Sequence, residues 1–400
     1  MSLQFLSDKE THPSQSHTTP VVSLCWAQPG LILSGGCDGT IKAVDPYSAL
    51  CYRDWPRFHS NAVHCITSNT AGTVALSSSI DGSIALWDLT PFSTAAPPHT
   101  VQDEAVEAEA ISQDPSLVSL PVQDAKTLML AQLDTITTTH PTPQAKLSEA
   151  WKTALHPTEP YFASIGAGAI VSLHSLPKGG SSELGLFLTS SEMPPSISKQ
   201  KDLFGLSLAF NRAGTLLAIG TNTGQVLLYT VSNSKLKLVT TYANHPSPIR
   251  TISFTAFLLL VGSDDRTVSV HDVKPILLPS QSSSCISGLD GKLRMGGTVA
   301  SLSGHKGWVL SVASVPVGDR NVFASVAMDK SFKFWDLSSA TKSTPVWNGG
   351  EVQLIRSFAF QPIPVQDKMD NTEAGGTSMT RFATGSEDGR LRFYRGAGLG

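Results

Sequence analysis

The chain has 400 residues, a hydrophobic fraction of 40% and a formal net charge of −3 at pH 7. A charge this close to neutral gives no electrostatic footprint for phosphate backbones, so direct nucleic-acid binding is not expected. No apolar run reaches the length of about 18 residues that a membrane-spanning helix needs. The start lacks the features of a secretory signal, and the five cysteines show no paired metal spacing. We therefore expect an intracellular protein, cytoplasmic and in part nuclear, with reduced thiols.

One short pattern recurs along the chain. Residues 77–88 read SSSIDGSIALWD, and residues 325–336 read SVAMDKSFKFWD. Each copy has a first apolar stretch, a tight turn carrying an Asp, and a second stretch that ends in an aromatic residue and an acid. Apolar residues that alternate with period two predict two β-strands joined by the turn.

Seven copies of this pattern can be aligned. Their turn residues are Asp38, Asp81, Gly168, Thr223, Asp265, Asp329 and Asp388, and six residues later stand Val44, Trp87, His174, Tyr229, His271, Trp335 and Tyr394. A spacing of roughly 40–45 residues with this ending is the signature of WD repeats. Such repeats bury their apolar faces only by closing on one another. We therefore predict an all-β fold, a single seven-bladed WD-repeat β-propeller over residues 1–400.

The long gap between the second and third turns needs an explanation. Residues 91–145 are rich in proline, contain an acidic run over residues 103–109, and have no aromatic–acid ending. We interpret them as one long disordered insertion rather than an eighth blade, with a strand at 127–133. Residues 275–300 and 361–379 are expected to be loop insertions. Resemblance to WD-repeat proteins implies that an N-terminal strand, here residues 3–7, completes the last blade.

The same resemblance implies a buried hydrogen-bond chain that runs from Trp through Ser or Thr and His to Asp inside a blade. Two repeats keep all four members, namely His59, Ser77, Asp81 and Trp87 in the second, and His305, Ser325, Asp329 and Trp335 in the sixth. Because a catalytic triad would occur once, we interpret these recurring sets as structural.

The start of each innermost strand bears on catalysis, because enzymatic propellers place carboxylates or a metal at the central channel. The expected starts are Val21, Val63, Ala150, Gly205, Ile249, Val309 and Ile355. They bring no clustered carboxylates or His ligands to the axis. We therefore expect no enzyme activity, catalytic residue, metal site, cofactor or small-molecule substrate.

A partner-binding face is predicted from three positions per repeat that point to the narrow top of such propellers. The predicted binding residues are Trp308, Phe204, Trp151, Arg250, Asp264, Leu310, Met328, Arg356 and Glu387. Exposed apolar surface with Trp and Arg anchors is typical of docking sites, and the two carboxylates are placed to accept a partner's Arg.

Alternatives to this partner-binding face remain open. Trp151 can belong to the core, Trp308 can pack sideways, and the two arginines can pair with local acids. The alignment can shift by one residue in repeats three and seven, because Lys146 and Glu351 stand in place of the guiding His.

Two stretches resemble a particular WD-repeat family, the WD-repeat subunit of the superkiller complex. Residues 303–312 (SGHKGWVLSV) are similar to its sixth-blade opening, and residues 388–398 (DGRLRFYRGAG) to its ending. The resemblance implies a non-catalytic scaffold that holds a tetratricopeptide-repeat protein and a DExH RNA helicase for 3′–5′ mRNA decay by the cytoplasmic exosome. Fungal relatives also bind a meiotic topoisomerase-like protein, and the family recognises a Gln-Arg pair followed by an apolar anchor. The alternative is an adaptor of a ubiquitin ligase or of a chromatin or transcription-elongation complex.

Overall fold

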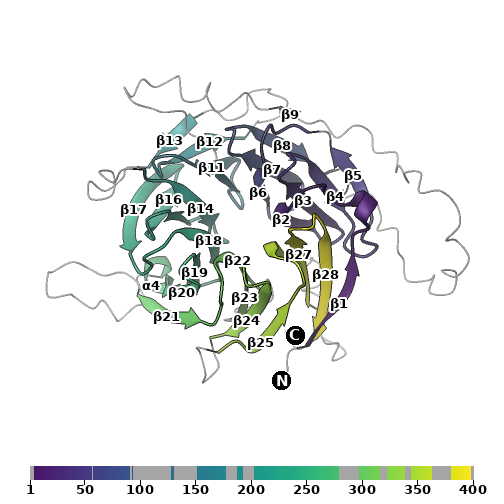
Figure 1. Cartoon of the computed structure of the whole chain (residues 1–400). Coiled ribbons are helices and arrows are strands. Elements are labelled where there is room, and N and C mark those ends of the chain that lie inside the picture. The colour runs from purple at the N-terminus through teal and green to yellow at the C-terminus, as the bar shows by residue number, and fades with distance from the viewer. Residues whose placement is uncertain are drawn as a thin grey trace, which may run out of the picture.

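The computed structural model describes residues 4–55, 57–90, 92, 128–129, 151–176, 187–191, 202–278, 297–315, 322–337, 344–362 and 380–397. These residues form seven four-stranded antiparallel sheets that surround a central axis (Figure 1). The prediction of an all-β, seven-bladed β-propeller is confirmed. We number the blades one to seven in the chain order of their innermost strands.

The first three blades, from the innermost strand outwards, follow chain order. Blade one contains β2 (Val21–Gln28), β3 (Leu31–Gly36), β4 (Ile41–Val44) and β5 (Cys51–Trp55). Blade two contains β6 (Val63–Ser68), β7 (Val74–Ser79), β8 (Ile84–Asp88) and β9 (Leu128–Met129). Blade three contains β10 (Lys152–Leu155), β11 (Tyr161–Ile165), β12 (Val171–Ser175) and β13 (Phe187–Ser190).

The next three blades repeat this order. Blade four contains β14 (Gly205–Phe210), β15 (Leu216–Thr221), β16 (Val226–Ser232) and β17 (Lys235–Tyr242). Blade five contains β18 (Ile249–Phe254), β19 (Leu258–Ser263), β20 (Thr267–Asp272) and β21 (Thr298–Ser303). Blade six contains β22 (Val309–Ser314), β23 (Val322–Ala327), β24 (Ser331–Asp336) and β25 (Trp347–Gly350).

Blade seven joins the two ends of the chain. It contains β26 (Ile355–Phe360), β27 (Thr380–Ser386), β28 (Leu391–Ala397) and, outermost, β1 (Gln4–Glu10). The two end strands run antiparallel and lie side by side in Figure 1. The predicted closure by the N-terminal segment is confirmed, and the strand extends beyond the expected residues 3–7 to Glu10. Closure removes the free sheet edges that an open propeller would expose.

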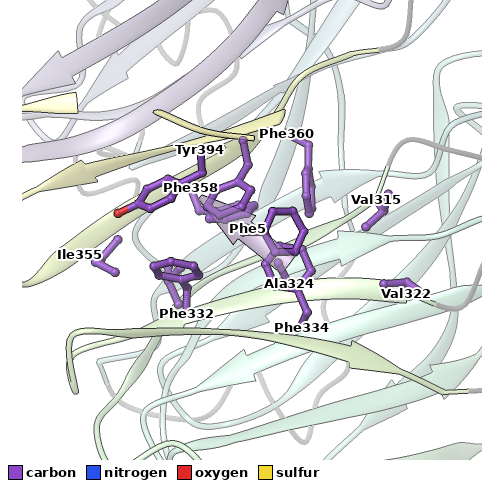
Figure 2. Close-up of a cluster of buried hydrophobic side chains, with 12 residues drawn as sticks. Phe5, Val315, Val322, Ala324, Phe332, Phe334, Ile355, Phe358, Phe360 and Tyr394 are labelled. Atoms are coloured by element: carbon purple, nitrogen blue, oxygen red, sulfur yellow. The ribbon is translucent and has the colours of Figure 1, made fainter. Parts of the chain in front are cut away.

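Aromatic packing and ion pairs hold β1 in place. Phe5 enters a cluster of buried side chains between blades six and seven (Figure 2). A Cβ on Gly396 of the partner strand would lie 2.2 Å from the Phe5 ring, so only glycine fits opposite Phe5. On the polar side, Asp8 lies 3.6 Å from both Arg381 and Arg395. Apolar and ionic contacts therefore act together at the closure.

Parts of the predicted insertions belong to the sheets. β9 pairs with β8 and lies within the predicted insertion 91–145, inside the strand expected at 127–133. A short helix, α4 (Lys274–Leu277), and the first residues of β21 fall in or at the edge of the predicted loop 275–300. Of the first insertion, Phe92 is also described, and of the loop 275–300, residues 278 and 297. The other residues of both insertions lie outside the described residues, and so do residues 363–379 of the third. β9 has only two residues, too few to show an apolar period, so the sequence signal for it is weak.

Six innermost strands begin at the predicted residue, and each has a β-bulge directly after it. The extra residues in these bulges, which have no partner in the strand register, are Val22, His64, Leu206, Arg250, Leu310 and Arg356. A bulge re-aims the side chain of the extra residue. The exception is blade three, where β10 begins at Lys152 rather than at Ala150, which lies outside the described residues.

Candidate protein-interaction face

The innermost strands surround a cavity of about 130 Å³. Four of the bulge residues line it, namely Val22, Arg250, Leu310 and Arg356. Small hydroxyl side chains one residue further along tie neighbouring blades together. Ser23 Oγ donates to the Val63 carbonyl at 2.6 Å, and Ser207 Oγ donates to the Ile249 carbonyl at 3.1 Å. These links fix the spacing between blades and hold the cavity open.

The predicted top-face positions lie together in space. In five blades, the residue before the turn donates its backbone N–H to the carbonyl of the residue before the innermost strand, at 2.9–3.0 Å. These pairs are Cys37–Pro20, Asn222–Phe204, Asp264–Pro248, Met328–Trp308 and Glu387–Leu354. The turns and the loops that precede the innermost strands therefore form one continuous face around the mouth of the central channel, which we call the top face.

Aromatic side chains occupy two places on the top face. Over blades three and four, Trp151 stacks on Phe204 with ring centroids 5.2 Å apart and planes 6° apart. Both side chains are half-buried. Over blades five and six, Trp308 is 46% exposed, and the Arg250 guanidinium lies 5.6 Å from its ring centroid. Trp308 is therefore the most accessible of the predicted anchors, with Leu310 and Met328 half-buried.

Two arginines on the top face are already paired. Arg250 donates through Nε and Nη2 to Asp264, at 2.9–3.1 Å. Arg356 donates through Nε at 3.0 Å and Nη2 at 3.1 Å to Glu387. The expectation that Asp264 and Glu387 are placed to accept a partner's Arg is therefore corrected, because each already accepts hydrogen bonds from an Arg of this chain. The alternative of local pairing is the one that the structure adopts.

His64 and Lys152 belong to the same mouth and were not among the predicted binding residues. Lys152 lines the cavity, and its Nζ donates to the His64 carbonyl at 3.0 Å. Burial, together with the charges of Lys152, Arg250 and Arg356, lowers the pKa of His64 to about 4. His64 occupies the bulge position in blade two that Arg250 occupies in blade five. The repeat alignment could therefore have identified His64 as a residue of the mouth.

Blade six contains the predicted structural tetrad in full. Trp335 Nε1 donates to Ser325 Oγ at 2.8 Å, and His305 Nε2 lies 2.8 Å from the same hydroxyl. His305 Nδ1 lies 3.1 Å from the Asp329 carboxylate. With the hydrogen bond from the His, the carboxylate has a pKa well below its usual range, even though burial opposes the shift.

Blade two differs from the predicted chain at one link. Trp87 Nε1 donates to Ser77 Oγ at 2.8 Å, and His59 Nε2 lies 2.8 Å from that hydroxyl. His59 Nδ1 contacts the Ser83 hydroxyl at 2.6 Å, and Ser83 in turn donates to Asp81. The hydroxyl of Ser83 therefore bridges the His and the Asp, which the sequence pattern did not reveal.

Blade seven replaces the tetrad with a buried carboxylate. Glu351, only 3% exposed, accepts hydrogen bonds from Thr384, Ser386 at 2.7 Å and Tyr394 at 2.9 Å. Arg392 Nη1 lies 3.2 Å from it and supplies the opposite charge. Burial and this neighbouring carboxylate raise the pKa of the Tyr394 hydroxyl. Glu351 thus takes the place of the guiding His in both sequence and space.

In blade five, the hydroxyl that contacts the His lies on the third strand of the blade rather than on the second. His245 Nδ1 lies 2.7 Å from Asp265, and its Nε2 lies 2.7 Å from Ser269 on β20. Ser269 also contacts His271 at 2.9 Å, so His271 stands where Trp stands in blades two and six. Blades two, five, six and seven thus each contain a polar chain, built from different residues in each blade.

Two further observations concern the residues that the structure describes. Among them, no group of three or more His, Cys, Asp or Glu side chains is arranged to hold a metal ion. No helix in the described ranges is long and apolar enough to cross a membrane. The top face is thus the candidate site that the described residues support best.

Comparisons with known proteins agree with the repeat pattern. The family described as "WD domain, G-beta repeat" matches residues 9–45, 55–88, 236–272 and 296–336. The chain is 26% identical over 347 residues to transducin beta-like protein 3 of Rattus norvegicus, covering 83% of this chain and 39% of that protein. It is 30% identical over 142 residues to the nuclear distribution protein PAC1 of Gibberella zeae, covering 35% of this chain and 26% of that protein.

A third relative is similar over a shorter stretch. The chain is 37% identical over 83 residues to the WD repeat-containing protein 55 homolog of Aedes aegypti, covering 20% of this chain and 17% of that protein. The chain thus spans less than half the length of each of these relatives. The seven four-stranded sheets and the repeat matches together show that the chain folds as a seven-bladed β-propeller that contains WD repeats.

Proposed function

We propose that this protein is a non-catalytic scaffold that binds partner proteins on its top face. WD-repeat propellers generally act as protein-interaction scaffolds, and the matching family is a repeat family rather than an enzyme family. The observation that carries the proposal is Trp308, which is 46% exposed on this face although it is one of the largest apolar side chains. Trp and Arg are the residues that most often anchor protein interfaces.

The local geometry supports a docking role for Trp308. The backbone bond from Met328 fixes the loop that carries it, and the Arg250 guanidinium, itself held by Asp264, holds the ring from one side. A side chain that is pre-oriented in this way loses little conformational entropy when a partner covers it. The same ring in a free loop would bind more weakly.

We propose further that the assembly is the superkiller complex, with a tetratricopeptide-repeat protein and a DExH RNA helicase as partners. The support is the resemblance of residues 303–312 and 388–398 to the WD-repeat subunit of that complex. The first stretch carries Trp308, and the second includes β28, the strand that pairs with β1. In this role the protein assists 3′–5′ mRNA decay by the cytoplasmic exosome, and in fungi also the start of meiotic recombination.

Affinity purification of the tagged protein from its own cells, with mass spectrometry of the bound proteins, tests both parts of the proposal. Near-stoichiometric recovery of a tetratricopeptide-repeat protein and a DExH helicase is the expected result. Recovery of a cullin adaptor or of chromatin or transcription-elongation subunits instead would overturn the complex and keep the scaffold. Recovery of no protein above a tag-only control would overturn both.

A further inference from the structure

Three cationic side chains line the cavity at the channel mouth, and they come from three blades that are not neighbours. Lys152 lies in blade three, Arg250 in blade five and Arg356 in blade seven. Blades four and six separate these three, and blades one and two close the circle. The cations therefore surround the mouth instead of forming a patch on one side of it.

Arg250 and Arg356 are held in fixed orientations, and each retains N–H donors that its carboxylate partner does not use. Each engages a carboxylate through Nε and Nη2, which fixes the plane of the guanidinium. Among the described residues, neither Nη1 atom has a hydrogen-bond partner. A guanidinium presents its donors in a rigid fork, so fixing one edge also fixes the direction of the other. Asp264 and Glu387 thus act as supports for two pre-oriented donors.

The charges at the mouth do not cancel. Lys152, Arg250 and Arg356 supply three positive charges against the two carboxylates, which leaves one positive charge in excess. The pKa of His64, lowered to about 4 by burial and by these three cations, reflects the same positive field. An anion that entered the mouth would therefore be attracted despite the internal ion pairs.

The size of the cavity limits what can enter. Its volume of about 130 Å³ equals the space of about four water molecules. That is room for one carboxylate or phosphate group with some water. An extended protein segment that projects one acidic side chain fits this volume.

We propose that the mouth of the central channel is a binding site for a single oxyanion, a carboxylate or a phosphate group, presented by a partner protein. Lys152, Arg250 and Arg356 are its ligands, and the two paired carboxylates position the arginines. The inference rests on the proposed function only for the source of the anion, because the site itself follows from the geometry of the mouth.

Titration of the full-length protein with inorganic phosphate and with acetate, at ionic strength held constant with chloride, tests the site directly. The readout is the NMR signal of the His64 imidazole, with exposed His12 as the internal control. A saturable shift of His64 alone is expected, and a rise of its pKa in the presence of the anion. Tighter binding of phosphate would indicate a phosphorylated side chain as ligand, and equal or tighter binding of acetate an Asp or Glu. Linear, non-saturating shifts with both anions would overturn the proposal.

Two substitutions at the mouth give opposite predictions. Arg356→Gln removes one ligand and the excess charge, and is expected to weaken anion binding about tenfold. Glu387→Gln raises the excess charge but keeps an amide oxygen that can accept from Arg356, and is expected to strengthen binding. Both side chains are about one-third exposed or more (34% and 40%), so neither substitution leaves a fully buried charge unpaired. Lys237→Gln, on the exposed outer strand β17, is the matched control and leaves binding unchanged.

The order of the affinities decides the outcome. Equal affinity of the wild-type and Arg356→Gln proteins, or weaker binding by Glu387→Gln than by Arg356→Gln, would overturn the site. Partner recovery by affinity purification is scored separately for the same variants. Lost anion binding with intact partner recovery would end this inference alone, whereas absence of any partner from the wild-type protein would end the proposed function and leave the anion site standing.

Discussion

The ring of Phe5 stacks on the ring of Phe334 with centroids 4.3 Å apart, so the first strand of the chain packs against blade six while it hydrogen-bonds to blade seven. Trp347 and Phe382 meet the same ring edge-on at 5.0 Å and 5.1 Å. Phe5 is thus the apolar side chain through which β1 reaches the neighbouring blade's core (Figure 2).

Replacing Phe5 with Ala is expected to cost about 3–5 kcal/mol of the free energy of unfolding, because it leaves a cavity among aromatic rings. Leu6→Ala is the matched control in the same strand. Leu6 is 66% exposed, so its truncation is expected to change stability by about 0.5 kcal/mol or less. Urea unfolding followed by tryptophan fluorescence measures both. Similar costs for the two variants would show that backbone pairing alone closes the propeller.

Glu351 provides a second test, since blade seven depends on a buried carboxylate where other blades have a His. Glu351→Ala leaves the Tyr394 hydroxyl without its acceptor and removes one partner of Arg392, and is expected to cost about 3 kcal/mol. Glu351→Gln keeps one acceptor oxygen and is expected to cost less. Exposed Glu159→Gln serves as control in the same unfolding assay. Unchanged stability of Glu351→Ala would contradict the structural role.

Two buried histidines predict how stability depends on pH. Burial lowers the pKa of both His59 and His271 to about 4, with Asp81 opposing the shift for the first and His245 adding to it for the second. The unfolded chain, with an ordinary His pKa near 6.5, therefore binds more protons between pH 6.5 and 4. Stability conferred by neutral His is present above pH 6.5 and is lost as the pH falls through this window.

His271→Tyr isolates one of these contributions. The same position holds Tyr229 in blade four and Tyr394 in blade seven, so a Tyr fits the repeat. The difference in unfolding free energy between pH 7 and pH 5 is expected to shrink by about 2 kcal/mol in this variant. Leu6→Ala, which changes no titratable group, is the control and is expected to leave the difference unchanged. A pH dependence identical to the wild type in His271→Tyr would show that His271 does not titrate in this range.

Trp308 and Trp335 should respond to truncation in opposite ways. Trp335 is 1% exposed and donates to a buried Ser, so Trp335→Ala is expected to cost about 3–5 kcal/mol. Trp308→Ala removes an exposed ring and is expected to leave the unfolding free energy within about 1 kcal/mol of the wild type. Circular dichroism and urea midpoints compare them. Loss of cooperative unfolding in Trp308→Ala would place this side chain in the core.

The repeat pattern predicted those parts of the molecule that the repeat itself specifies. Trp335 and Ser325 lie at fixed distances from a turn Asp, and their hydrogen bond follows the same spacing as that of Trp87 and Ser77. The starts of six innermost strands follow from the same spacing. Periodic apolar residues and periodic polar sets are strong signals because every blade must satisfy the same packing.

Other interactions depend on side-chain directions that the repeat spacing does not specify. The pairing of Arg250 with Asp264 recurs in blade seven between Arg356 and Glu387. The sequence left this local pairing open as an alternative, because it does not show which acid an Arg contacts. The bridging role of Ser83 and the four donors around Glu351 likewise depend on side-chain directions. A strand was expected at 127–133, and β9 lies within it. Its place in blade two was not predicted, because it pairs through two residues far along the chain from β8.

The most direct test of the scaffold claim compares partner recovery by three tagged proteins under identical conditions. They are the wild type, Trp308→Ala, and Leu188→Ala, which truncates a side chain that is 42% exposed on the outer strand β13. The account predicts that Trp308→Ala loses about 90% or more of the bound partners, as expected for an interface anchor, while Leu188→Ala keeps them. Full recovery with Trp308→Ala, together with loss in Leu188→Ala, would contradict the top face as the docking surface and move it to the rim.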